Sequence, residues 1–317
     1  MPPPLRLIML GTGDFALPTF EHLVGSGFNV VALVTQPDRP QGRKQELIPS
    51  RIKQSAQAHQ IPVEQPENVN APESLAVIQA YNPDLLVTAA YGQILSPELL
   101  GIPPLGGINL HGSILPAYRG AAPVARAIER GERETGVTVI RMTPRIDAGG
   151  MLAFARTAIE PNETAGELEA RLALLGAPLI ASIIEAIHQG TAEVLPQQKS
   201  KVTKAPKLSK DDGTIDWTKP GQTVHNLVRA MRPWPLASTS WHRAAGPVRL
   251  IVHQSEVVEG HGRPGQVLEA TGDRLIVAAG EGAVRLLVVQ MVGKKPSPAT
   301  EFLRGHHPFG DFMGPRA

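Results

Sequence analysis

Three polar residues in the first half of the chain have the types that acyl-transfer chemistry needs. Asn109 and His111 lie two residues apart in the run 109–116 (NLHGSILP), and Asp147 begins a second run, 147–150 (DAGG). A carboxamide and a protonated imidazole can both donate hydrogen bonds to an oxyanion that develops on a carbonyl group. A carboxylate can orient the imidazole, favour its charged form and help to remove a proton from an attacking amine. Together these residues predict acyl transfer without a nucleophilic side chain.

A metal site and a purely structural role are the alternatives for these residues. Zinc needs three or four protein ligands, and no His-x-x-x-His or cysteine spacing supplies them, so we expect no metal. A single buried histidine more often serves packing than chemistry, and Asn109 alone could cap a turn. The pair His306 and His307 is expected to be solvated.

Local patterns predict that the three residues lie where strands end. Residues 107–111 form a short apolar run, and side chains at positions i and i+2 of a strand share one face, so Asn109 and His111 point the same way. Residues 136–142 and 151–159 are predicted to form a hairpin whose loop, 143–150, contains Asp147. Ligands of open α/β sheets bind at the carboxyl ends of the strands.

The elements before residue 190 alternate between strands and helices. Strands are predicted over 5–10, 29–35, 84–88 and 107–111, with helices over 50–59, 70–81 and 164–188. This alternation predicts an α/β domain with a Rossmann-like, mostly parallel sheet. Residues 11–16 (GTGDFA) fit the dinucleotide pattern G-x-G-x-x-G/A, but strand 29–35 lacks the acidic residue that should follow about 20 positions later. We therefore interpret the glycines as a tight strand-to-helix turn.

Length and composition favour a two-domain protein. The chain has 317 residues, more than one core usually supports, and no cysteine, which suits a reducing, cytoplasmic location. No secretory signal is visible, and inspection finds no apolar run long enough to span a bilayer, so no membrane association is expected. Residues 1–190 carry 14 Lys and Arg against 18 Asp and Glu, a net charge of −4; residues 191–317 carry 17 against 11, a net charge of +6. The basic second half hints at a polyanionic partner.

The amino-acid composition of the chain changes after the long predicted helix. Residues 197–210 are polar and contain five lysines, which predicts a basic linker over 191–210 between a catalytic domain, 1–190, and a second domain, 211–317. The second domain shows one helix, 223–231, and short alternating runs at 248–252, 265–269, 275–279 and 284–289. These runs predict a small C-terminal β-barrel of the OB-like type. Trp217 and Trp234 are expected in its core.

The polar constellation and several flanking motifs resemble the 10-formyltetrahydrofolate-dependent formyltransferases. The run 109–116, the following 119–123 (RGAAP) and Asp147 carry the resemblance to the family as a whole. It extends along nearly the whole chain to the members that act on tRNA, through the motifs at 11–16 (GTGDFA), 35–40 (TQPDRP), 90–92 (AYG), 208–210 (LSK), 215–217 (IDW) and 232–235 (RPWP).

The resemblance implies formyl transfer from 10-formyltetrahydrofolate, as a cosubstrate, to the α-amino group of methionine on initiator tRNA. It implies that Asn109, His111 and Asp147 are catalytic. It also implies a folate site, without a metal, lined by residues that lie in two segments: Tyr91, Gly92, Ser113, Ile114, Leu115 and Pro116.

Basic residues in two segments are the candidates for tRNA binding. In the family the loop 37–49 meets the acceptor end, which suggests Arg39, Arg43 and Lys44, although Gln45 and Glu46 make this loop less basic than is usual. Five lysines could follow the phosphates along the linker: Lys199, Lys201, Lys204, Lys207 and Lys210.

Three alternatives remain open at this point. The first is a sister formyltransferase, or a folate hydrolase, that acts on a small amine or on water. The second is a nucleic-acid-binding protein without enzymatic activity, and the third is a nicotinamide-dependent oxidoreductase. The oligomeric state is not determined by the sequence, but nothing in it suggests an obligate dimer, and a monomer is expected.

Overall fold

The structure, a computed structural model, describes residues 3–41, 46–243 and 245–314. These residues form two compact units, each made of three stretches of chain. One unit contains residues 1–120, 135–157 and 169–205, and the other contains residues 121–134, 158–168 and 206–317. The predicted domain boundaries at residues 190 and 210 stay a prediction. The two compact units are not continuous in sequence, because residues 121–134 and 158–168 belong to the second unit.

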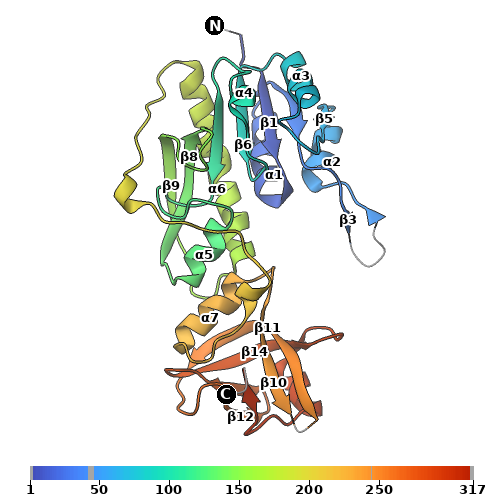
Figure 1. Cartoon of the computed structure of the whole chain (residues 1–317), viewed down its shortest axis with the longest axis vertical. Coiled ribbons are helices and arrows are strands. Elements are labelled where there is room, and N and C mark those ends of the chain that lie inside the picture. The colour runs from blue at the N-terminus through green and yellow to red at the C-terminus, as the bar shows by residue number, and fades with distance from the viewer. Residues whose placement is uncertain (1–2, 42–45, 244, 315–317) are drawn as a thin grey trace. The chain divides into compact units, whose positions relative to one another are not determined.

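A seven-stranded sheet forms the centre of the first unit (Figure 1). Its strand order is β5-β2-β1-β6-β7-β8-β9, in which the first five strands are parallel and β8 is antiparallel to β7. The strands are β1 (Leu7–Gly11), β2 (Val30–Val34), β5 (Val63–Glu64), β6 (Leu85–Ala89), β7 (Gly107–His111), β8 (Glu134–Arg141) and β9 (Met151–Ala158). The predicted Rossmann-like, mostly parallel sheet is confirmed, with bounds within about two residues of the predicted strands for most elements.

Helices accompany this sheet, and a small hairpin of β3 (Pro40–Gln41) and β4 (Glu46–Leu47) lies apart from it. The helices are α1 (Gly13–Gly25), α2 (Arg51–Ala58), α3 (Pro72–Ala80), α4 (Pro97–Leu100) and α6 (Ala165–His188). On one face of the sheet, strand residues such as Ile8 and Leu86 form a core with Ile78 of α3 and Leu99 of α4. Such burial of branched aliphatic side chains stabilises the sheet by about 1.5–3 kcal/mol for each side chain.

The glycines of the dinucleotide-like motif serve packing. A Cβ atom on Gly11 would lie 2.6 Å from Cβ of Ala16 and 3.1 Å from the carbonyl oxygen of Ala89, so only glycine lets α1 approach the strands here. Gly13 begins α1 with φ of +73°, a conformation that other residues adopt at a cost. The interpretation of residues 11–16 as a tight turn agrees with this geometry.

Helix α6 is the one described helix that is long and apolar enough to cross a membrane by length and composition, contrary to the expectation from inspection of the sequence. Of its most apolar window, 44% is buried inside the protein, and a single helix of this kind is weak evidence for a membrane span. In the part of α6 that belongs to the first unit, a Cβ atom on Gly176 would lie 2.4 Å from the side chain of Leu110. The helix therefore packs closely on β7.

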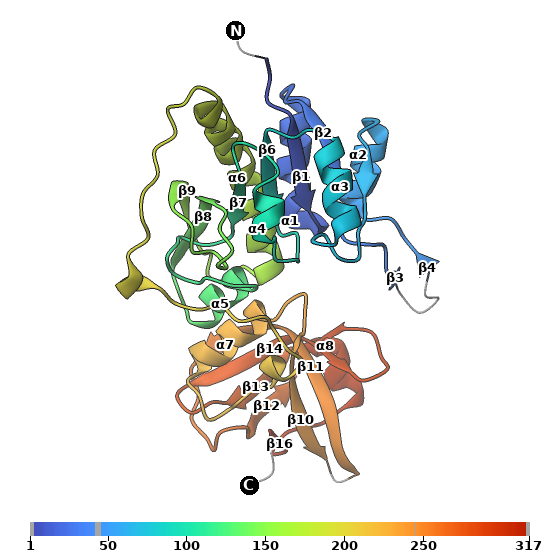
Figure 2. The ribbon, with the colours of Figure 1, turned by 45° about the horizontal axis from the view of Figure 1, so that its top comes forward.

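The second unit is built around an antiparallel barrel (Figure 2). The strand order is β12-β13-β14-β11-β10-β16, and Phe312 of β16 also bridges to Gln266, next to β12, so the sheet curls back towards its first strand. The predicted β-barrel is confirmed. Its strands are β10 (Ala237–Arg243), β11 (Gly246–Val258), β12 (Val267–Thr271), β13 (Arg274–Ala278), β14 (Ala283–Met291), β15 (Ser297–Pro298) and β16 (Phe312–Met313), and the helices of this unit are α5 (Pro123–Glu129), α7 (Gly221–Ala230) and α8 (Ala299–Gly305).

The two predicted core tryptophans of this unit differ. Trp217 is buried in the barrel core and donates a hydrogen bond of 2.9 Å from Nε1 to the hydroxyl of Thr239, as predicted for a core indole. Trp234 is 50% exposed, so its prediction as a core residue is wrong. The second tryptophan of this core is Trp241, whose Nε1 donates to Asp311 at 2.9 Å.

Candidate active site

Strand β7 presents Asn109 and His111 from the middle of the sheet. Asn109 lies opposite Thr88 of β6 on one side and Ile140 of β8 on the other, and His111 lies opposite Thr138. Because the two residues are separated by one position, their side chains leave the same face of the strand, as predicted. His111 is the last residue of the strand, at the carboxyl edge of the sheet.

The ring of His111 is buried and fixed from one side. Its Nε2 lies 2.9 Å from the carbonyl oxygen of Tyr118. Because a carbonyl can only accept, Nε2 carries a proton, and this leaves Nδ1 as the variable position. Nδ1 lies 3.6 Å from Oδ2 of Asp147, which is longer than a hydrogen bond but places the carboxylate beside the ring.

Asp147 lies in the loop between β8 and β9, as predicted, and is held in a defined orientation. Its Oδ2 accepts a hydrogen bond of 2.9 Å from the backbone N–H of Gly120. Its side chain is 12% exposed and that of His111 is 6% exposed, so little water screens the two groups from each other. Asp147 has φ of +49°, in the left-handed region that residues other than glycine seldom adopt. Such conformations are maintained by their surroundings and are concentrated at functional sites.

Asn109 is the least constrained of the three residues. Its side chain is half-buried, and its amide has no hydrogen-bond partner within the part of the chain that the structure describes. Among these residues, Nδ1 of His111 has no partner within hydrogen-bond distance either. The Asn109 amide can donate to the oxygen of a bound carbonyl group, and Nδ1 of His111 can donate to the same oxygen when the ring carries its second proton.

The predicted folate stretch contains two kinds of residue. Ser113 and Leu115 are buried, and Ser113 donates from its hydroxyl to the carbonyl oxygen of Ala117 at 2.7 Å. Ile114 and Pro116 are partly exposed and can contact a ligand. Thus the side chains of Ser113 and Leu115 shape the loop, and those of Ile114 and Pro116 are the ones exposed enough to contact a ligand.

Thr138 of β8 supports this loop, and no sequence pattern identifies it. Its hydroxyl donates to the carbonyl oxygen of Ser113 at 2.7 Å and accepts from the N–H of Leu115 at 3.1 Å. The signal that identifies Thr138 is its pairing with His111 across the two strands, which requires the sheet order.

Tyr91 and Gly92 follow β6, and the side chain of Tyr91 is not available to a ligand. It is 2% exposed, packs in the core of the first unit, and its hydroxyl has no hydrogen-bond partner among the described residues. Burial raises the pKa of this phenol to about 12. The carbonyl oxygen of Tyr91 accepts from the side chains of Thr12 at 3.3 Å and Gln36 at 3.1 Å. Any contribution to a folate site comes from the backbone of this segment, where Gly92 has φ of +92°.

The residues predicted to bind tRNA lie on the surface wherever they are described. Arg39 pairs with Glu67 at 2.5 Å, an exposed ion pair of the kind that contributes only about 0–1 kcal/mol and that a phosphate could replace. Arg43 and Lys44 lie outside the described residues. The five predicted lysines of the linker are all exposed: Lys199, Lys201, Lys204, Lys207 and Lys210.

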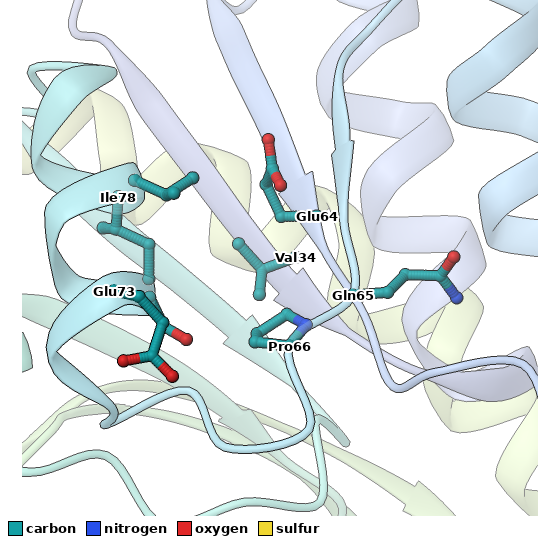
Figure 3. A pocket seen from close by; sticks show the side chains of 8 residues that line it. Val34, Glu64, Gln65, Pro66, Glu73 and Ile78 are labelled. Atoms are coloured by element: carbon teal, nitrogen blue, oxygen red, sulfur yellow. The ribbon is translucent and has the colours of Figure 1, made fainter.

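A separate cavity of about 230 Å³ lies between the end of β2, β5 and α3 (Figure 3). It is lined by the apolar side chains of Val34 and Ile78, and by Glu64 and Glu73. Asn109, His111 and Asp147 do not line this cavity, so it is not the site described here. Within residues 3–41, 46–243 and 245–314, no three His, Asp or Glu side chains come together in a way that could hold a metal ion.

Comparison with known proteins finds two matching family profiles and similar proteins that have names. The family profile described as "Formyl transferase" matches residues 5–184, and that described as "Formyl transferase, C-terminal domain" matches residues 207–307. The chain is 44% identical over 301 residues to the methionyl-tRNA formyltransferase of Pseudomonas syringae pv. tomato, with 95% of each chain covered. It is 41% identical over 302 residues to the methionyl-tRNA formyltransferase of Geobacillus thermodenitrificans, covering 95% of this chain and 94% of the relative.

Solved structures with low sequence identity share the fold. The structure of HypX from Aquifex aeolicus in complex with tetrahydrofolic acid superposes with a TM-score of 0.66 at 16% identity, covering 95% of this chain and 47% of HypX. WlaRD, a sugar 3N-formyl transferase, superposes with a TM-score of 0.66 at 17% identity, covering 92% of this chain and 99% of WlaRD.

Proposed function

The chain belongs to the formyl transferase family, and from this premise we propose that it formylates initiator methionyl-tRNA. The donor is 10-formyltetrahydrofolate, the acceptor is the α-amino group of methionine, and the product, N-formylmethionyl-tRNA, serves translation initiation. The observation that carries the proposal is the identity of 41–44% to methionyl-tRNA formyltransferases, which extends over both units of the chain.

In the proposed reaction, Asn109 and His111 hold the charge that develops on the formyl oxygen. The α-amine attacks the formyl carbon, and the oxygen becomes an oxyanion that accepts hydrogen bonds from the Asn109 amide and from Nδ1 of His111. Asp147 lies 3.6 Å from Nδ1 and stabilises the charged ring. Donors that are fixed before the reaction stabilise such an oxyanion at little cost of reorganisation.

Asp147 also serves the proton that the amine must lose. The bond between the formyl carbon and N10 of the folate breaks as the carbonyl re-forms, and N10 takes up the proton that Asp147 has received from the amine. Asp147 accepts the proton of the attacking amine, directly or through one water, so that protons balance over the reaction. Its left-handed backbone and its hydrogen bond to Gly120 support this role, because they hold the carboxylate beside His111.

The second half of the chain is proposed to bind the tRNA. Its net charge of +6 and the exposed lysines between residues 199 and 210 suit a phosphate backbone. A small amine would need neither feature, which weighs against the sister formyltransferases that act on small acceptors. We place the reaction in the cytoplasm, where initiator tRNA is used, and propose that the protein acts as a monomer.

The test is an assay of formyl transfer from 10-formyltetrahydrofolate to three acceptors: charged initiator tRNA, charged elongator tRNA and free methionine. We expect rapid transfer to charged initiator tRNA and little to the other two. Equal transfer to free methionine would mean that the acceptor is a small amine. Hydrolysis of the donor without transfer to any acceptor would identify a folate hydrolase.

A further inference from the structure

Gln197 lies in the polar segment after α6, which the sequence predicts as a linker, yet its side chain joins the two loops of the candidate active site. Its Nε2 donates hydrogen bonds to the carbonyl oxygens of Asp147 at 2.9 Å and Gly149 at 2.7 Å. Its Oε1 accepts from Arg119, at 3.0 Å from Nε and 2.6 Å from Nη2. Both N–H hydrogens and both oxygen lone pairs of the carboxamide are thus used. Glutamine is the one uncharged side chain of this length that can donate and accept two hydrogen bonds each.

The backbone beyond Gln197 holds the same loop. The N–H of Tyr118 donates to the hydroxyl of Thr203 at 2.8 Å, and the N–H of Arg119 donates to the carbonyl oxygen of Thr203 at 2.9 Å. The N–H of Ala205 donates to the carbonyl oxygen of Arg119 at 2.7 Å. Gly120 fits closely, since a Cβ atom there would lie 2.5 Å from the carbonyl oxygen of Ala205.

These contacts control the positions of two of the three catalytic side chains in the proposed mechanism, those of His111 and Asp147. The carbonyl oxygen of Tyr118 fixes Nε2 of His111, and the N–H of Gly120 fixes Oδ2 of Asp147. Gln197 connects the segment 118–120 to the backbone of Asp147 itself, in the residue whose φ of +49° has to be maintained by its surroundings.

We propose that Gln197 is a positioning residue that sets the distance between Asp147 and His111 by linking Arg119 to the loop 147–149. The inference rests on the formyl transfer proposed above. The side-chain hydrogen bonds of Gln197 go to two backbone carbonyls and one guanidinium, and none goes to the side chains of Asn109, His111 or Asp147. Because a displacement of about 1 Å in a catalytic constellation can cost about 10²-fold in rate, its loss should slow the chemical step rather than binding.

Three variants separate this role from a general effect on folding. Gln197→Ala removes all four hydrogen bonds. Gln197→Glu keeps the size and the partner for Arg119 but places a carboxylate oxygen against the carbonyl oxygens of Asp147 and Gly149. Gln198→Ala is the matched control, because Gln198 is the next residue and is exposed. For each variant, the single-turnover rate of formyl transfer to charged initiator tRNA is measured at saturating enzyme and donor. The rate is normalised to the number of folded sites, which is counted by tetrahydrofolate binding.

We expect a decrease of about 10- to 100-fold in this rate for Gln197→Ala and at least as large a decrease for Gln197→Glu, with dissociation constants for tetrahydrofolate and tRNA within about twofold of the original protein. Gln198→Ala should match the original protein. A normal rate per folded site in both Gln197 variants would overturn the inference, because a purely structural residue changes only the number of folded sites. A normal rate in Gln197→Glu alone would also overturn it, because the contact to Arg119 would then be sufficient. If the original protein and Gln198→Ala transfer no formyl group at all, the proposed function fails rather than the role of Gln197.

Discussion

The substitution Asp147→Asn removes one charge from the candidate active site and changes little else. Asparagine has the same shape, and its side-chain oxygen can still accept the hydrogen bond that Oδ2 of Asp147 receives from the N–H of Gly120 at 2.9 Å. Asparagine is also among the residues that tolerate the left-handed conformation found here, with φ of +49°. The loop should therefore keep its conformation, and the change tests the carboxylate charge alone.

The size of the effect follows from the distance and the burial. Two unit charges 3.6 Å apart, the separation of Nδ1 of His111 and Oδ2 of Asp147, interact by about 1 kcal/mol in water and by about 4–5 kcal/mol at an effective dielectric constant of about 20. The two side chains are only 6% and 12% exposed, so the larger value applies better. Since each 1.4 kcal/mol corresponds to a factor of ten, we expect a rate loss of about 10³-fold if His111 is charged in the transition state.

Single-turnover formyl transfer from 10-formyltetrahydrofolate to charged initiator tRNA measures this rate directly. Thermal unfolding of the variant, followed by circular dichroism, should remain close to that of the original protein. Asp211→Asn, which removes a charge from an exposed aspartate in the second unit, is the control for net charge and should leave the rate unchanged. A rate for Asp147→Asn within about threefold of the original would refute the assignment of Asp147 to the chemical step.

Four other outcomes follow from the structure. Asn109→Ala should lower the single-turnover rate by about 10²–10³-fold with an unchanged unfolding temperature, as for the loss of one oxyanion donor; a rate near normal would exclude Asn109 as that donor. Tyr91→Phe removes a buried hydroxyl that lacks a partner among the described residues, so activity should persist and the free energy of unfolding in urea should stay equal or rise by about 1 kcal/mol. Burial lowers the pKa of His225, so this histidine binds a proton more readily in the unfolded chain than in the folded protein. The unfolding temperature should therefore fall as the pH drops below about 6.5, and His225→Asn should flatten this dependence between pH 7 and 5. Replacing the five lysines between 199 and 210 by serine should weaken tRNA binding. A plot of the logarithm of the tRNA association constant against the logarithm of the salt concentration should become less steep, by about 0.7–0.9 for each phosphate that is no longer neutralised. An unchanged slope would mean that these lysines only solvate the segment.

The fold can be predicted where a local pattern has one physical interpretation. The sequence predicts strand β7 with its observed bounds, because an apolar run of five residues next to a polar loop has few other solutions. The long helix α6 follows from apolar residues at helical spacing. Short elements such as β5, β15 and β16 have no such signal, because two residues form a strand only when a neighbouring strand is already in place.

Predictions from sequence are wrong where burial depends on the surroundings rather than on residue type. Trp234 and Trp241 have the same side chain and lie in the same unit, yet Trp234 is 50% exposed and Trp241 lies in the barrel core. Tyr91 follows a strand at the carboxyl edge of the sheet, and its ring packs in the core, so its place in a folate site stays a prediction that only its backbone could fulfil. A sequence records which side chains prefer burial, and the packing of distant elements decides which of them are buried.

The amino-acid sequence by itself determined the residue types of the candidate site and the segments that carry them, because a carboxamide and an imidazole in one strand and a carboxylate in the loop of a hairpin are local features. Only the tertiary structure decided that Asp147 lies 3.6 Å from His111 and that the carbonyl oxygen of Tyr118 accepts a hydrogen bond from Nε2 of His111. It also decided that Gln197, 50 residues after Asp147, holds the loop that contains Asp147. The contacts of Asp147 with His111 and Gln197 join segments that lie 36 and 50 residues apart, and the contact of His111 with Tyr118 spans a loop of seven residues. Their geometry depends on sheet order and on backbone conformations with positive φ, which no local pattern specifies.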